Sequence, residues 1–226
     1  GKGGEGVMAI LFLTYTIPVI LLLSVLIYKP WRKNYVPVKT IASAAFVLLA
    51  LWCGIHGEDQ TLMRLELPAF VLCLCGDVFL GFYNGNRRKK YFIGGVFAFL
   101  MGHVFFLISF CSIQSISWTD ILFPFLGTAV TAFLTNLERM YLGKLRPYVY
   151  LYSFFITMVF VKAVHVQMQM PDTGNLCRAI GTGLILISDF LILFLYFYKN
   201  RPWPTHGWNL ATYYYGMFFI AVGLLY

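Results

Sequence analysis

Two aspartates lie inside long apolar stretches, where an acidic side chain is unusual. Asp77 belongs to the sequence LCGDVFL and Asp189 to the sequence ISDF. A charged side chain at the centre of a bilayer costs about 2.5–3.5 kcal/mol on insertion scales, and such residues usually serve a function. Because two carboxyl groups in unequal surroundings can divide acid and base roles in one reaction, this pair forms the candidate catalytic residues.

The composition indicates which kind of protein positions these acids. Of 226 residues, 60% are hydrophobic and only 12% are charged, and the mean hydropathy is +0.75. The apolar stretches are long and lack the alternation of a membrane β-barrel, so the chain is expected to be an all-α polytopic transmembrane bundle. The net charge of +8 fits basic cytoplasmic loops and does not indicate a nucleic-acid partner.

The apolar stretches predict about eight helices in one transmembrane domain that covers residues 1–226. Residues 1–7 are glycine-rich and are interpreted as a tail outside the fold. The fifth span is short and rich in threonine. The expected spans are residues 8–28, 36–55, 67–82, 91–111, 118–134, 147–168, 176–198 and 208–226.

The distribution of basic residues predicts the orientation of these helices. Twelve of the seventeen Lys and Arg residues fall in the odd-numbered loops, and three fall in the N-terminus and the even-numbered loops. Positively charged loops remain on the cytoplasmic side of a membrane. We therefore expect a multi-pass protein with cytoplasmic odd-numbered loops and with both termini on the other side.

This orientation gives several polar residues a similar depth. Asp77 lies about five residues from the cytoplasmic end of its span, or roughly 8 Å, and Asp189 about nine residues, or roughly 14 Å. Lys39, Tyr213 and Tyr214 belong to spans that begin on that side. We expect the two aspartates to face one cavity, with Lys39 and Tyr214 on its wall. The alternative is that Lys39 only neutralises a buried acid or extends to the interface.

His103 is a further candidate, because Gly95, Phe99 and His103 recur at intervals of four and share one helical face. A histidine that binds a neighbouring helix is an equally good interpretation. Lys162 and His165 lie in the opposite half of the membrane, and we expect them to have a structural role or to extend to the interface.

Other common catalytic patterns are missing from the sequence. It contains no HExxH or comparable metal-ligand cluster and no glycine-rich phosphate loop, so neither a metal nor a cofactor is expected. Ser188 and Asp189 are adjacent on a helix and cannot face each other as members of a triad. The five cysteines are scattered through apolar segments and are expected to be unpaired.

At these positions the chain resembles the lysoplasmalogenase family of integral membrane proteins, the YhhN type. The resemblance rests on motifs in five helices: Lys39, GDVFL at 76–80, GxxxFxxxH at 95–103, GxxxxxxSD at 181–189 and TYY at 212–214. The chain has Met217 where this family usually has glutamine, and Ile185 where it usually has phenylalanine.

The resemblance implies hydrolysis of the vinyl ether bond of lysoplasmalogen to a fatty aldehyde and glycerophosphoethanolamine or glycerophosphocholine. Asp77 and Asp189 would be catalytic, and the implied substrate-binding residues are Lys39, His103, Ser188, Tyr213 and Tyr214. The chemistry is compatible, because protonating the alkene carbon and capturing the oxocarbenium ion with water require one protonated acid and one anionic group.

Two other functions remain open at this level. Intramembrane Asp, Lys and His also mark ion pathways, so the chain could be a proton-coupled transporter. It could also be a lipid-binding protein without turnover. The expected partners are a lysophospholipid substrate and membrane lipids, and the oligomeric state is left open.

Overall fold

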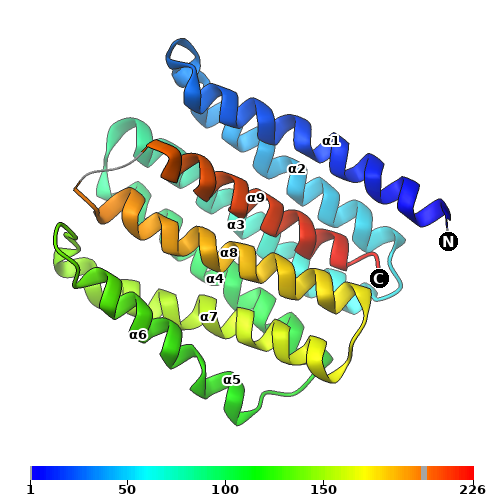
Figure 1. The fold of residues 1–226 in the computed structure, drawn as a ribbon. Coiled ribbons are helices and arrows are strands. Elements are labelled where there is room, and N and C mark those ends of the chain that lie inside the picture. Colours follow the sequence, from blue (N-terminus) through cyan, green and yellow to red (C-terminus); the bar gives the residue numbers. More distant parts are fainter. Residues whose placement is uncertain (1, 200–202) are drawn as a thin grey trace.

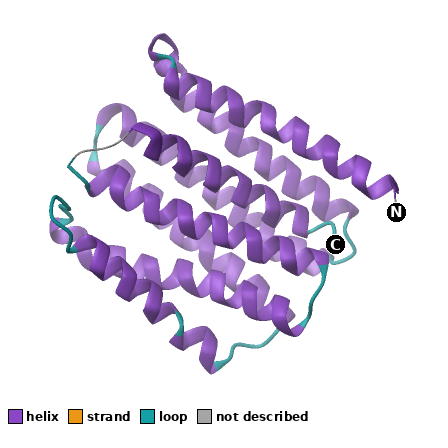
Figure 2. Cartoon of the chain, viewed as in Figure 1, coloured by secondary structure: helices purple, strands orange, loops and turns teal. Residues whose placement is uncertain are grey.

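The computed structural model describes residues 2–199 and 203–226, and within these ranges the fold is helical (Figures 1 and 2). The helices are joined by short loops, and the β-type pairing in the described residues is an isolated bridge between Met140 and Tyr198. The elements are α1 (Lys2–Ile27), η1 (Lys29–Asn34), α2 (Tyr35–His56), α3 (Gln60–Asn86), α4 (Lys89–Ile113), α5 (Trp118–Leu122), α6 (Pro124–Thr135), η2 (Gly143–Leu145), α7 (Arg146–Gln169), α8 (Thr173–Phe197) and α9 (Trp203–Gly223).

Six of these helices form a closed ring. Around the ring α2 packs on α3, α3 on α4, α4 on α7, α7 on α8, α8 on α9, and α9 returns to α2. Helix α1 lies outside the ring against α2 and α9, and α6 lies outside it against α7 (Figure 1). The polar residues of interest come from helices of the ring.

The predicted transmembrane bundle is confirmed. Seven helical segments are long and apolar enough to cross a membrane, with α5 and α6 counted as one segment. Helix α9 is not one of the seven, because its first half is polar, yet it runs alongside α8 as an eighth long segment (Figure 1). The two chain ends lie at the same end of the bundle, and the connections between α1 and α2, α3 and α4, and α6 and α7 lie at the other end. Which end faces the cytoplasm remains a prediction.

Four spans differ from the sequence prediction. Helix α1 begins at Lys2, within the stretch expected to be a tail, and α9 begins at Trp203, five residues before the predicted start. Helix α3 begins at Gln60, seven residues before the predicted start, because the Asp59 side chain caps it by accepting hydrogen bonds from the backbone N–H groups of Thr61 and Leu62. The predicted fifth span is broken between α5 and α6, where Pro124 starts a new helix.

Helices α8 and α9 approach closely through two pairs of glycines. A Cβ atom on Gly181 would lie 2.6 Å from the carbonyl oxygen of Gly216, and one on Gly174 would lie 2.9 Å from that of Gly223. The two glycines of each helix are seven residues apart and therefore share a face. Small residues let helix backbones come together in a membrane, so these pairs fix how α8 lies on α9.

Candidate active site

A buried ion pair joins α2 to α3. Lys39 Nζ lies 2.9 Å from Asp77 Oδ1, and the two side chains are 6% and 1% exposed. The second carboxylate oxygen, Oδ2, accepts hydrogen bonds from the Ser43 hydroxyl at 2.7 Å and the Tyr213 hydroxyl at 2.8 Å. A charged group so far from water needs this number of partners, so the contacts favour an ionised Asp77.

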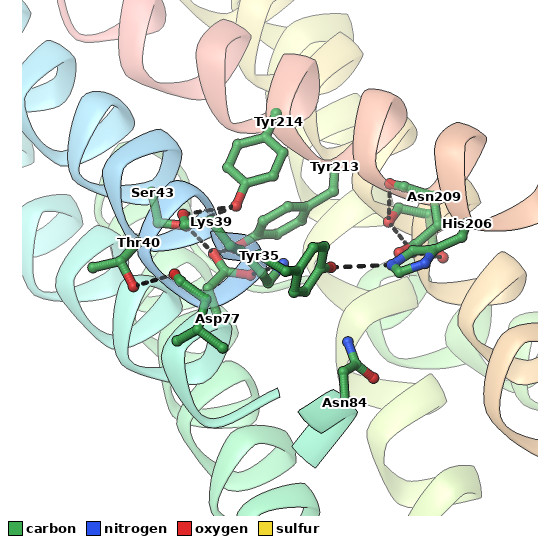
Figure 3. A network of polar contacts seen from close by, with 12 residues as sticks. Tyr35, Lys39, Thr40, Ser43, Asp77, Asn84, His206, Asn209, Tyr213 and Tyr214 are labelled. Carbon is green, nitrogen blue, oxygen red and sulfur yellow. Dashed lines mark hydrogen bonds and ion pairs between the residues drawn. The ribbon is translucent and has the colours of Figure 1, made fainter. Parts of the chain in front are cut away.

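Two tyrosines of α9 complete this network, as Figure 3 shows. The Tyr214 hydroxyl lies 2.8 Å from the Ser43 hydroxyl, and the Lys39 ammonium lies 5.7 Å and 5.5 Å from the centres of the Tyr213 and Tyr214 rings. Aromatic faces attract a cation at this range. The ammonium group is therefore held between the aspartate and two rings, which limits its movement.

Asp189 has very different surroundings. It lies on α8, and within the described residues its carboxyl group has one hydrogen-bond donor, the Tyr152 hydroxyl, at 3.4 Å. It is 9% exposed and has no basic partner within ion-pair distance among the residues that the structure describes. A carboxyl group that is buried with so few partners is favoured in its neutral, protonated form. The two acids are therefore placed in contrasting environments.

Both aspartates line one small space, which we call the inner cavity. It is enclosed by α2, α3, α4, α8 and α9, and its volume is about 20 Å³, enough for about one water molecule. Of the candidate residues, the inner cavity is lined by Lys39, Asp77, His103, Ser188, Asp189 and Tyr213. These six predicted residues are thus brought together from helices that are distant in the sequence.

The remaining candidate, Tyr214, does not line the inner cavity, so the expectation that it forms part of the wall was wrong. Its hydroxyl instead contacts Ser43, which donates to Asp77. Ser188 lines the cavity, but its hydroxyl donates to the Asn209 backbone oxygen at 3.0 Å and accepts from the Asn209 side-chain amide at 2.9 Å. The Ser188 hydroxyl therefore mainly joins α8 to α9.

The His103 ring lines the inner cavity and has one free acceptor. Its Nδ1 lies 2.7 Å from the backbone oxygen of Phe99, four residues earlier. Because a carbonyl oxygen can only accept, Nδ1 must be the protonated nitrogen, and Nε2 of the neutral ring carries a lone pair. This Nε2 is buried without a hydrogen-bond partner in the described part of the chain, so it can accept a hydrogen bond from a water molecule or a substrate.

A larger channel, which we call the apolar groove, leads from Asp189 to the outside of the bundle. It lies between α4, α7 and α8 and has a volume of about 390 Å³. Phe97 and Tyr148 on its rim are 63% and 66% exposed, so the groove opens sideways, toward the lipid. Among the described residues that line the groove, Asp189 is the only one with a carboxyl group, and the others are aliphatic or aromatic.

Sequence reasoning missed several residues of the network. Tyr35 and Ser43 lie four residues before and after Lys39 and therefore share its face of α2. The Tyr35 hydroxyl lies 3.1 Å from His206 Nε2 on α9. A search for polar residues at helical spacing around Lys39 would have found both. Tyr152 gives no comparable signal, because it reaches Asp189 from a different helix.

Two other buried ion pairs lie in other parts of the bundle. Lys162 is completely buried, and its ammonium lies 3.1 Å from Asp120, which also contacts His165 at 2.9 Å. Lys162 therefore does not extend to the interface, and its contacts agree with the expected structural role. Glu66 and Arg178 form the second pair, at 3.2 Å, and link α3 to α8.

Comparison with known proteins gives one match. A model described as the YhhN family matches residues 34–224, which include every residue of the network described above. No curated protein and no solved structure matches the chain.

Proposed function

Because this chain belongs to the YhhN family, the family that includes lysoplasmalogenases, we propose that it hydrolyses the vinyl ether bond of lysoplasmalogen. The observation that carries the proposal is the pair of aspartates on one cavity, one of them ion-paired and the other nearly unpartnered. The products would be a fatty aldehyde and the glycerophospho-ethanolamine or -choline.

In the proposed first step, Asp189 is the acid. Its location on the wall of the apolar groove lets the alkenyl chain reach it. The carboxyl group donates its proton to the second carbon of the alkenyl chain, and the carbon attached to oxygen becomes an oxocarbenium ion. The Asp77 carboxylate stabilises this positive charge across the cavity, as a fixed negative group can in a site that excludes water.

In the second step a water molecule adds to the oxocarbenium carbon. His103 Nε2 accepts a proton from that water, because it is a free acceptor on the same cavity. The resulting hemiacetal breaks its bond to the glycerol oxygen, which takes the proton held by His103, and the hemiacetal hydroxyl gives its proton to Asp189 as the aldehyde forms. One water is consumed in total, and the acid regains its proton. General acid–base assistance of this kind contributes about 10²–10⁴-fold to the rate.

Purified protein incubated with lysoplasmalogen tests the proposal, with release of fatty aldehyde as the measurement. The saturated ether analogue is a matched negative substrate, because it has no alkene carbon to protonate. We expect aldehyde from lysoplasmalogen and no product from the analogue.

A variant comparison assigns the chemistry to the two acids. Asp77→Asn and Asp189→Asn should each lose nearly all turnover while the protein stays folded. Glu66→Gln is the control, because Glu66 is a buried acid of the same helix as Asp77 but does not line the cavity. Folded protein that binds lysoplasmalogen without releasing aldehyde would favour the lipid-binding alternative and refute the hydrolase.

A further inference from the structure

A third cavity, which we call the basic vestibule, lies where the apolar groove reaches the end of the bundle. It is formed by the end of α3, the start of α4, the segment 140–146 and the end of α8, and its volume is about 720 Å³. Its charged lining residues are Lys89, Lys144 and Arg146. No Asp or Glu lines it in the described part of the chain, so the vestibule is suited to an anion.

Two of these cations have no partner of their own. Lys89 and Lys144 form no ion pair and no side-chain hydrogen bond within the described ranges, and both are exposed. Arg146 is half-buried and is held in place, because its guanidinium donates to the Asn136 side-chain oxygen at 2.7 Å. The vestibule thus has one fixed cation and two that are free to contact a ligand.

Two helix N-termini add to this positive charge. Lys89 is the first residue of α4 and Arg146 is the first residue of α7, and no side chain caps either helix. At the start of α7 the Arg146 N–H already donates to the Gly143 oxygen and Pro147 has no N–H, so α7 adds mainly the partial positive charge of its end. The first N–H groups of a helix have no partner within the helix, and this end has a partial positive charge. Oxygen atoms of a phosphate group are well suited to such donors and to Lys and Arg side chains.

The vestibule and the apolar groove are continuous. Phe92, Ile93, Leu145, Tyr196 and Phe197 line both of them. Along α8, Phe197 at the vestibule is eight residues from Asp189, or about 12 Å at the rise of an α-helix. A glycerol backbone, together with the long side chains of Lys and Arg, can span this distance. An anionic headgroup and a hydrocarbon chain could therefore occupy the two spaces at once.

We propose that the basic vestibule binds the phosphate of a single-chain glycerophospholipid whose hydrocarbon chain lies in the apolar groove. The placement of the vinyl ether bond next to Asp189 rests on the proposed function, but binding of the lipid can be measured without turnover. Because no carboxylate among the described residues lines the vestibule, the phosphate and not the ammonium group of the headgroup provides the recognition.

A binding experiment with saturated ether lipids tests this without hydrolysis. The probes are 1-O-hexadecylglycerol 3-phosphate, its phosphocholine derivative and the uncharged 1-O-hexadecylglycerol, added to the full chain in a neutral detergent. Both phosphate probes should bind at least about tenfold more tightly than the uncharged one, a difference of about 1.4 kcal/mol. The probe without choline should bind at least as tightly as the one with choline.

Variants identify the residues that cause the preference for the phosphate probes. Lys89→Gln combined with Lys144→Gln should remove most of the preference for phosphate and leave binding of the uncharged probe unchanged. Lys90→Gln is the matched control, because Lys90 is adjacent in the sequence but contacts the Tyr91 ring and does not line the vestibule.

Three results would overturn the proposal: equal binding of all three probes, an equal loss in the Lys90→Gln control, or competition by millimolar inorganic phosphate as strong as that of the lipid. The last would make the vestibule a site for free phosphate. Aldehyde release from lysoplasmalogen by the wild type, measured separately, reports on the proposed function and not on the vestibule.

Discussion

Replacing Lys39 with methionine removes half of the ion pair at the centre of the site. The Asp77 carboxylate would remain buried, 1% exposed, without its cation. Breaking a buried pair on one side costs about 3–5 kcal/mol. Asp77 keeps its hydrogen bonds from Ser43 and Tyr213, so we expect the lower end, about 3 kcal/mol. For a chain of this length that corresponds to a decrease in Tm of roughly 6–12 °C.

The double variant Lys39→Met with Asp77→Asn separates stability from catalysis. Removing both charges at once is close to neutral for stability, and the asparagine oxygen can still accept the hydrogen bond from Tyr213. We therefore expect the double variant to recover most of the lost Tm. It should not recover turnover, because the carboxylate that stabilises the oxocarbenium ion is absent. Thermal unfolding in detergent and aldehyde release are measured on the same samples.

Either of two results would refute this reasoning. If the double variant regains activity along with stability, Asp77 is only the structural partner of Lys39. If Lys39→Met unfolds at the wild-type temperature, the ion pair does not stabilise the fold, and the contrast between the two acids loses its basis.

The remaining predictions concern one residue each. Asp189→Asn should lose turnover with little change in Tm, because Asp189 has a single long hydrogen bond to lose; a fall in Tm as large as that of Lys39→Met would contradict the description of its surroundings. His103→Phe keeps a ring of similar size but lacks Nε2, so kcat should fall by about 10²-fold or more with unchanged lipid binding, and unchanged kcat would exclude it as the base. Gly181→Ala should lower stability by about 1–3 kcal/mol, because its new Cβ would meet the backbone of α9. Gly85→Ala, which meets nothing within 4 Å, is the control for Gly181→Ala, and equal melting temperatures for the two would argue against the close approach of α8 and α9.

Most helices of the bundle were predictable from the sequence, because an apolar stretch of sufficient length indicates a transmembrane helix. The exceptions have local causes. Pro124 breaks the fifth span. The first half of α9 is polar, so hydropathy alone indicates this helix weakly, but the alternation of basic loops required an eighth helix. The predicted start of α3 was late, because hydropathy does not register a helix that begins with the polar residues from Gln60 onward.

The sequence predicted the membrane depth of the candidate site residues but not all of the residues that contact them. Intramembrane acids are visible in any sequence, and orientation gave Asp77 and Asp189 a common half of the membrane. The pairing of Asp189 with Tyr152 depends on α7 packing against α8. The apolar groove depends on α4 packing against α7, two helices that are not consecutive. Such neighbours are set by the whole bundle, and no local pattern in the sequence encodes them.

The sideways opening of the apolar groove determines how a membrane enzyme of this design would exchange its reactants. A lipid that enters between α4 and α7 arrives by diffusion in the plane of the bilayer and need not leave it. The relevant concentration is therefore the mole fraction of substrate among the lipids, and rates should fall when inert lipid dilutes it at constant total amount. The fatty aldehyde can return to the bilayer by the same opening, while the water-soluble product can leave through the vestibule, so the two products depart into different phases.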